Sequence, residues 1–383
     1  MKTLKKITAV LMACLIFSAL FTACKGGNDA DKGNKNSQNT AVKTIRYLNF
    51  KPEIADKYQK ISEEYEKETG IKVIVETAAN NTYEQTLTAK MATDDAPTIF
   101  QINGPHGYNN WKDYCAELSG TEIYKHLTDK EMAVTSNGGV YGIPYVVEGY
   151  GIIYNSEITD KYFALQNKAA KFTSMADINT FAALSALVQD MQKNASALGI
   201  EGVFSSTSLK AGEDWRWQTH LANIPVYYEF RKNDIDLTSD AAKKISFEFA
   251  ENYKNIFDLY TNNSVSDKKE LGRKIVDESM AEFAQGKSAM VQNGNWEWSQ
   301  ISGIAGNTVK ESNIKFLPIY TGVAGEEKQG ICIGTENFLA INSKASEAEQ
   351  KAAADFLYWL YSSEKGKSFV LNDLGFIAPF DTI

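Results

Sequence analysis

The chain has 383 residues, of which 43% are hydrophobic and 23% charged, and its formal net charge is -8 at pH 7. Such an acidic chain is a poor partner for nucleic acid or for an anionic membrane surface, because phosphate groups attract clustered lysine and arginine. The roughly 340 residues from Val42 onward exceed what one hydrophobic core usually organises, so we expect two domains.

The first 24 residues have the order of a secretory signal. Lysines precede an apolar run from Ile7 to Phe21, and Cys24 follows directly before polar residues. This pattern predicts a lipoprotein signal peptide over residues 1–23, with Cys24 diacylated as the new N-terminus. An ordinary cleaved signal is a second interpretation. An uncleaved membrane helix is a third, weakened because the run is shorter than the ~20 residues that a bilayer requires.

Residues 24–42 form a polar segment after the signal. Beyond Cys24 they are almost all Lys, Gly, Asn, Asp, Ser, Gln and Thr, without apolar periodicity. Such a segment buries too little apolar surface to fold, so we predict a disordered linker. It would tether a globular body to the extracytoplasmic face of the cell membrane, with a root-mean-square span of about 25 Å.

The body begins with alternating strand and helix patterns. Strands are predicted at 44–50, 71–77 and 97–103, and helices at 52–69 and 82–93. This β-α-β-α-β order predicts a mostly parallel sheet.

The segment VYGIPYVVEGYGIIYN (140–155) differs, because its two strand-like runs are joined through Glu148 and Gly149 without an intervening helix. We interpret it as a crossing from one lobe to another. Helical patterns dominate from about 175 to 260. Beyond them the patterns predict a helix at 276–285, strands at 288–292, 315–320 and 337–342, and a long helix at 346–361.

Several motifs follow one another with a consistent spacing. The lipobox is followed by VYGIPYVVEGYGIIYN, AEFAQGKSAMVQNGNWEWSQI and FLAINSKASEAEQKAAADFLYWLYSSEKGK. Together they resemble the extracellular solute-binding proteins (family 1) of carbohydrate ABC transporters, which include the maltose-binding protein. The resemblance implies an α/β, two-lobe periplasmic-binding-protein-like fold with a central cleft and crossing hinge strands. It implies an N-lobe of 43–148 plus 317–343 and a C-lobe of 149–316 plus 344–383.

The resemblance also implies a function. It predicts a monomeric substrate-binding lipoprotein that captures an oligosaccharide and delivers it to the permease subunits of an ABC importer, with no enzyme activity and no cofactor. Two rival interpretations are a secreted glycoside hydrolase that uses two carboxylates, and a sugar-sensing or adhesion lipoprotein without transport. Family members generally run a few dozen residues beyond the point that Ile383 reaches, so a C-terminal truncation is one interpretation of this chain.

Two tryptophan clusters supply what a sugar site requires. A pyranose offers apolar C–H faces and a rim of hydroxyls, which suit aromatic platforms and fixed hydrogen-bonding groups. Trp296, in NGNWEWSQ, matches the stacking tryptophan of the family and has Asn295 beside it; Trp298 is either core or site. In DWRW, Trp215 and Trp217 lie two residues apart and face different directions, so one can stack on sugar while the other packs inward.

Polar candidates come from strand ends. Glu148 matches a cleft carboxylate of the family, with a solvated hinge residue as the alternative. Asn103 and Asn49 lie at the C-terminal ends of predicted parallel strands, where open α/β sheets present ligands. Glu336 precedes the strand predicted at 337–342 and either contributes its side chain to the cleft or belongs to a turn.

Cys115 and Cys332 are the cysteines left in the body. They either form a disulfide or stay as thiols, and the sequence leaves both alternatives open. The three histidines are isolated from one another and from cysteine, so no metal site is predicted.

Overall fold

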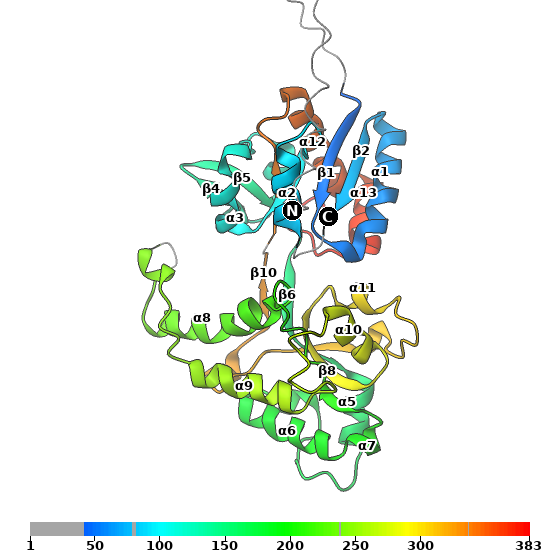
Figure 1. The fold of residues 1–383 in the computed structure, drawn as a ribbon, viewed down its shortest axis with the longest axis vertical. Helices are drawn as coiled ribbons and strands as arrows, with labels where there is room; N and C mark the ends of the chain where they lie inside the picture. Colours follow the sequence, from blue (N-terminus) through cyan, green and yellow to red (C-terminus); the bar gives the residue numbers. More distant parts are fainter. Residues whose placement is uncertain (1–41, 79–81, 237–238, 336) are drawn as a thin grey trace, which may run out of the picture. The chain divides into compact units, whose positions relative to one another are not determined.

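The computed structural model describes residues 42–78, 82–236, 239–335 and 337–383. The signal, Cys24 and the linker up to residue 41 lie outside these ranges. Within the described residues the strands form two sheets, each with its own helices and hydrophobic core (Figure 1). We call the residues packed on the first sheet the N-lobe and those packed on the second the C-lobe.

The N-lobe sheet has the strand order β2-β1-β3-β11-β5-β4. Strand β1 runs parallel to β2 and β3, as the alternating patterns predict, and β11 runs antiparallel to β3 and β5. The strands are β1 (Thr44–Asn49), β2 (Lys72–Thr77), β3 (Ile99–Ile102), β4 (Val134–Ser136), β5 (Gly139–Pro144) and β11 (Phe338–Ile341). The helices are α1 (Ala55–Thr69), α2 (Tyr83–Met91), α3 (Gly104–Trp111), α4 (Glu122–Lys125), α12 (Glu347–Ser362) and α13 (Glu364–Ser368).

Helix α1 shows how the sequence determines these elements. Pro52 opens the preceding turn, where its fixed φ and missing N–H carry no penalty. Tyr58, Ile61 and Tyr65 are buried on one face of the helix and join the N-lobe core. Gly70 ends the helix in the left-handed conformation, at a φ of 74°.

The C-lobe sheet has the order β10-β6-β8-β7, with β9 also paired to β6. Its strands are β6 (Glu148–Asn155), β7 (Gly202–Phe204), β8 (Ser288–Gly294), β9 (Ile314–Leu317) and β10 (Cys332–Gly334). Its helices are α5 (Ser156–Phe163), α6 (Phe181–Lys193), α7 (Ala195–Leu198), α8 (Ala222–Lys232), α9 (Ala250–Asn262), α10 (Val276–Ala284) and α11 (Glu297–Ile301). The region predicted to be helical, 175 to 260, therefore also contains β7.

Short helical turns connect these elements. Those used below are the 3-10 turn η1 (Pro52–Ile54) and the π-helical turn η5 (Arg216–Leu221), which continues into α8. The others are η2 (Lys112–Tyr114), η3 (Lys130–Met132), η4 (Met175–Asp177), η6 (Asp240–Lys243), η7 (Glu311–Asn313), η8 (Glu326–Lys328) and η9 (Phe369–Asp373).

The chain passes between the sheets at the predicted crossing. Strand β5 belongs to the first sheet, and β6 begins at Glu148 in the second. The return runs from β10, which pairs antiparallel with β6, to β11 in the first sheet. The α/β class, the two lobes and the crossing strands are thus confirmed.

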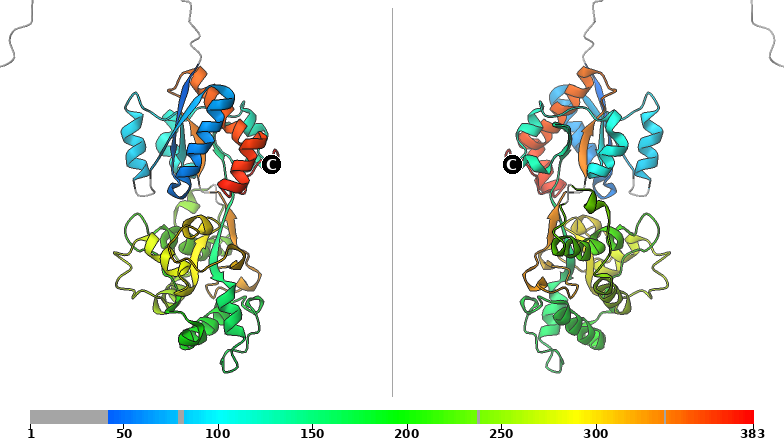
Figure 2. Two further views of the ribbon diagram at one scale, coloured as in Figure 1. Left: turned by 90° about the vertical axis from the view of Figure 1, so that its right-hand side faces the viewer. Right: turned by 90° about the vertical axis from the view of Figure 1, so that its left-hand side faces the viewer.

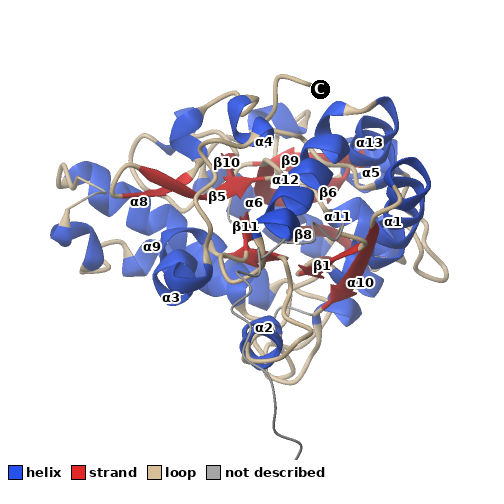
Figure 3. Cartoon of the chain, turned by 90° about the horizontal axis from the view of Figure 1, so that it is seen from above, coloured by secondary structure: helices blue, strands red, loops and turns tan. Residues whose placement is uncertain are grey.

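The packing of the C-terminal region differs from the expected lobe boundaries. Residues 344–383 were expected in the C-lobe, but α12 packs on β1 and β11, and its buried face joins the N-lobe core through Ala353, Phe356 and Leu360. Figure 3 shows α12 crossing β11, and Figure 2 shows the C-terminus, in red, next to the N-lobe helices. Within 317–343, Ile319 and Tyr320 belong to the C-lobe core. An amphipathic pattern indicates that a face is buried, but not on which sheet.

In the described ranges, no helix combines the length and the apolar composition that a bilayer crossing requires.

Candidate functional site

Four aromatic rings come together in the C-lobe, and we call them the aromatic group: Tyr150, Trp215, His220 and Trp296. The rings of Tyr150 and His220 are stacked, with centroids 3.9 Å apart and an interplanar angle of 4°. The Trp215 and Trp296 centroids lie 6.0 Å apart, and their planes are inclined by 49°. His220 is fully buried, whereas the other three rings are partly exposed. The exposed ring faces are the surface that this group offers to a ligand.

Secondary structure explains why these rings meet. Trp215 precedes the π-helical turn η5, in which residues five apart are hydrogen-bonding neighbours. The spacing brings His220 back beside Trp215, with ring centroids 4.8 Å apart. Tyr150 of β6 is paired with Gly294, the last residue of β8, and Trp296 follows two residues later at the start of α11. The adjacent strands thus bring Trp296 to the same place as Tyr150.

The turn that carries Trp296 is closely fitted. Its ring lies on the backbone of Gly294, where an added Cβ would be 2.1 Å from Cζ3 of Trp296. Asn295 fastens the turn to β6, because its N–H donates to the Gly149 carbonyl at 2.9 Å and its Oδ1 accepts from the Gly149 N–H at 3.2 Å. Asn295 therefore supports Trp296 through the backbone of Gly149.

A buried ion pair lies beside the aromatic group. Lys51 Nζ is 2.5 Å from Glu148 Oε1, and both side chains are nine-tenths buried or more. The same ammonium lies 5.6 Å from the ring centroid of Trp296 and 3.9 Å from a carboxylate oxygen of Glu53. Charges withdrawn from water in this way need partners, because an isolated buried charge is costly. The pair fixes two side chains that can hydrogen-bond to hydroxyl groups.

Beneath the tryptophans lies a second buried polar cluster. Arg216 and Glu297, the residues that follow Trp215 and Trp296, are each 1% exposed. Asn293 of β8 joins them: its Oδ1 accepts from Arg216 Nε at 3.0 Å, and its Nδ2 donates to Glu297 Oε2. The Arg216 guanidinium also lies over the Trp215 ring, 4.0 Å from the centroid.

Burial shifts the pKa values of both ionisable groups in this cluster. It raises the pKa of Glu297 to about 7, against the opposing effects of the Asn293 hydrogen bond and the Arg216 charge. It lowers the pKa of Arg216 to about 10. Among the described residues, neither Nη1 nor Nη2 of Arg216 has a hydrogen-bond partner, and the same holds for Oε1 of Glu297.

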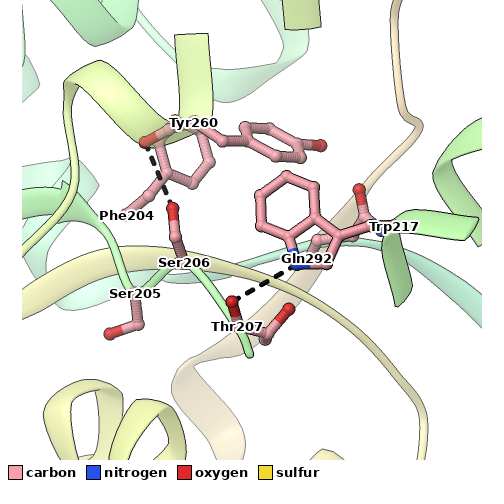
Figure 4. Close-up of a pocket in the computed structure, with 7 residues that line it drawn as sticks. All are labelled: Phe204, Ser205, Ser206, Thr207, Trp217, Tyr260 and Gln292. Carbon is pink, nitrogen blue, oxygen red and sulfur yellow. Dashed lines mark hydrogen bonds between the residues drawn. The ribbon is translucent and has the colours of Figure 1, made fainter. Parts of the chain in front are cut away.

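Trp217 is placed differently from Trp215. It is 4% exposed, belongs to the C-lobe core, and donates from Nε1 to the carbonyl of Thr207. Figure 4 shows its indole beside a small cavity that Tyr260 and Gln292 also line. The volume of that cavity is about 10 Å³, room for one water molecule and none for a sugar. Of the DWRW pair, Trp215 faces the aromatic group, and the burial of Trp217 argues against its predicted ligand contact.

No ring contact with the aromatic group is found for the other predicted residues that the structure describes. Asn49 is buried, and its amide donates to the Lys51 carbonyl and to Thr77, so it holds the turn that presents Lys51. Asn103 is exposed at the start of α3 in the N-lobe. Trp298 is partly buried against the apolar cluster of α10 and β8. Glu336 lies outside the described residues.

The two cysteines of the body are free thiols, Cys115 buried in the N-lobe and Cys332 partly buried in β10. Burial raises the pKa of Cys115 to about 12, so this thiol is a poor nucleophile at neutral pH.

The sequence interpretation missed Tyr150, His220, Lys51 and Arg216. A signal existed for Tyr150, because residues two apart on a strand share a face and Glu148 was already a candidate. For His220, isolation in the sequence was misleading, since its partners come from β6 and α11.

Two characterised proteins are similar in sequence over part of their length. Spermidine/putrescine-binding periplasmic protein 1 of Haemophilus influenzae is 25% identical over 256 residues, 62% of each chain. The melibiose/raffinose/stachyose-binding protein MelE of Bacillus subtilis is 28% identical over 153 residues, which span 39% of this chain and 35% of MelE. Each match thus spans less than two thirds of the relative.

Solved structures share the fold. The GacH receptor of Streptomyces glaucescens superposes with a TM-score of 0.65 at 18% identity, covering 88% of this chain and 80% of GacH. Unliganded RafE of Streptococcus pneumoniae gives a TM-score of 0.60 at 18% identity, covering 90% of this chain and 83% of RafE. Residues 60–383 match the family described as bacterial extracellular solute-binding protein, and the chain belongs to that family.

Proposed function

We propose that this chain is the substrate-binding lipoprotein of an ABC importer, which captures an oligosaccharide between its lobes and delivers it to the membrane permease. The observation that carries the proposal is the pair of partly exposed rings, Trp215 and Trp296, beside the Lys51–Glu148 ion pair. Two relatives support this ligand class: one RafE structure is a complex with raffinose, and MelE is named for three oligosaccharides.

The geometry fits the chemistry of a short sugar chain. Aromatic faces pack against the C–H faces of pyranoses, and fixed polar groups bind their hydroxyls. Two platforms inclined by 49° suit consecutive units of a chain that bends at its glycosidic bond. In this proposal Trp215, Trp296, Glu148 and Lys51 contact the sugar, while Asn295 and Asn49 hold the turns that present them. Asn103 and Glu336 stay predicted ligand contacts.

A polyamine is the second ligand class to weigh, because one relative is named for spermidine and putrescine. A polycation requires carboxylates that are not already neutralised. Here Glu148 is paired with Lys51, and the Arg216 guanidinium covers one side of Trp215. These two cations would repel a polyamine, whereas a neutral sugar is compatible with them.

Binding without chemical conversion distinguishes this function from that of a glycoside hydrolase. Family members are binding proteins, which act because a ligand favours the closed arrangement of the lobes over the open one. We expect residues 43–383 to bind a di- to tetrasaccharide with a Kd near the micromolar range, about -8 kcal/mol. Titration calorimetry against a panel of oligosaccharides, with putrescine and spermidine as comparison ligands, measures this directly.

Two results would contradict the proposal. One is that the protein binds a polyamine and binds no sugar of the panel. The other is steady cleavage of a bound sugar, detected by chromatography after prolonged incubation.

The membrane anchor is part of the proposal. Cys24→Ala is expected to abolish lipidation and release the protein from the membrane fraction. Sugar affinity should be unchanged, because β1 begins about twenty residues later, beyond the segment that the sequence predicts to be a disordered linker. Fractionation with detection of the protein tests this, with Cys115→Ala as the matched cysteine control. Recovery of the Cys24→Ala protein in the membrane pellet at wild-type level would refute the anchor.

A further inference from the structure

Resting on the proposed function, we propose that Arg216, Asn293 and Glu297 form a buried relay that positions Trp215 and Trp296 as a unit, and that ligand affinity falls when Glu297 takes up a proton. Arg216 lies over the Trp215 ring, and all three relay side chains are too buried to meet the ligand. They are therefore positioning residues.

The relay is connected to both tryptophans through adjacent residues of the backbone. Arg216 and Glu297 are the immediate neighbours of Trp215 and Trp296 in the chain, and both side chains are buried. The amide of Asn293 links the two side chains, because its oxygen accepts from the guanidinium and its nitrogen donates to the carboxylate. A shift of either charged side chain must therefore be transmitted to the backbone that carries a ligand-facing ring.

Two further contacts make this connection stiff. The Gln292 Nε2 donates to the Arg216 carbonyl at 2.7 Å, which ties η5 to the neighbouring residue of β8. Asn293 Nδ2 also donates to Gln300 of α11 at 2.8 Å. The guanidinium itself backs the Trp215 ring at 4.0 Å. The segments that carry Trp215 and Trp296 are thus both tied to Asn293, and the Trp215 segment is tied to Gln292 as well.

The charge state of Glu297 decides whether the positive charge of Arg216 is compensated inside this relay. Ionised, Glu297 compensates the buried positive charge of Arg216. Protonated, it leaves the guanidinium, whose two Nη atoms already have no hydrogen-bond partner among the described residues, with only the weaker charge effects of Glu53 and Glu213 as compensation. A buried cation without its nearest counter-charge moves toward water or toward those carboxylates. Either movement changes the contact between the guanidinium and the face of Trp215.

Other ionisable groups near the rings must be separated from Glu297. Arg216 faces Glu297 from η5, while His220 and Lys51 contact the tryptophan rings themselves. Helix α10 packs on α11, but it presents Met280 to Asn293. Of its three acidic residues, Asp277 and Glu278 are exposed, and Glu282 is paired with Lys274 at 2.6 Å. A pH profile alone therefore does not identify the group, and a Glu297 variant is required.

The experiment compares wild type with Glu297→Gln from pH 5.5 to 8.5. For wild type we expect sugar affinity to be about tenfold weaker at the acid end, with a midpoint near 7 set by the raised pKa of Glu297. Glutamine keeps the shape and an acceptor for Asn293 but does not titrate, so its profile should be flat. Glu326→Gln is the matched control: Glu326 is also buried, but it accepts from the N–H groups of Phe181, Thr321 and Gly322.

A second readout needs no ligand, so failure of the relay and failure of the proposed function are distinguishable. The near-ultraviolet circular dichroism of the unliganded protein should change over the same pH range, because the environment of Trp215 changes. This signal should be lost in Glu297→Gln and in Trp215→Phe, and kept in Glu326→Gln. Two results would overturn the relay even if every sugar binds as expected. One is a wild-type spectrum that does not change with pH, and the other is a Glu297→Gln pH profile that matches that of wild type.

Discussion

Replacing Trp296 by alanine is expected to weaken sugar binding by 100-fold or more, which corresponds to about 2.7 kcal/mol. The ring is a partly exposed platform at the centre of the proposed site, seated on Gly294 and facing the ammonium of Lys51. Its removal deletes the platform but breaks few contacts of the hydrophobic core. The melting temperature of the unliganded protein should therefore change little. Titration calorimetry and thermal melts on the same preparation measure the two effects.

Trp298 is the control for this substitution. It lies two residues away but packs against the apolar cluster of α10 and β8. Trp298→Ala should lower the free energy of unfolding, by less than the ~3–5 kcal/mol of a fully buried tryptophan, and keep the affinity of the folded fraction. If Trp296→Ala binds every sugar as well as wild type, the position of the site is wrong and the surface around Trp215 becomes the leading candidate.

Trp217→Ala is expected to have the largest effect on stability, lowering the free energy of unfolding by about 3–5 kcal/mol. The indole is 4% exposed, lies 4.9 Å from the Phe257 ring centroid, and donates a hydrogen bond to Thr207. Truncation leaves a cavity and an unpaired carbonyl in the C-lobe core. Urea denaturation followed by circular dichroism measures the loss.

The matched variant is Trp215→Ala, which changes the same residue type two positions earlier. Because Trp215 is partly exposed, its loss should weaken sugar binding strongly while unfolding free energy falls by a smaller amount than in Trp217→Ala. The reverse pattern, with stability lost at Trp215 and affinity lost at Trp217, would show that the roles of the two rings have been exchanged.

Local sequence signals predicted most of the fold. Alternating apolar patterns located β1, β2 and β3. Gly70 predicted the end of α1, and in the structure it has the left-handed conformation that ends the helix. The run through Glu148 and Gly149 predicted the crossing. Strands β4, β7 and β10 were missed because three residues are too few to show an alternation. The lobe on which α12 packs was also missed, since that choice depends on contacts far apart in the chain.

The candidate site was predictable only in part, for a similar reason. Motif resemblance and side-chain chemistry pointed to Trp296 and Glu148. The spacing of Trp215 and Trp217 predicted that one of them turns inward, but not which one, because the π-helical turn η5 decides it. Lys51 reaches the site through tertiary contacts that leave no local pattern, and His220 lies beside Trp215 because η5 is a π-helical turn. Asn49 ends β1, as the end-of-strand argument expects, yet both ends of its amide hydrogen-bond within the turn itself.

A crystal structure of residues 43–383 with the sugar selected by calorimetry would test the location of the ligand most directly. We predict that one sugar face lies in van der Waals contact with Trp296, that a neighbouring unit packs on Trp215, and that Glu148 or Lys51 hydrogen-bonds to a hydroxyl. A sugar bound elsewhere on the molecule, with the rings of Trp215 and Trp296 untouched, would contradict the proposed site.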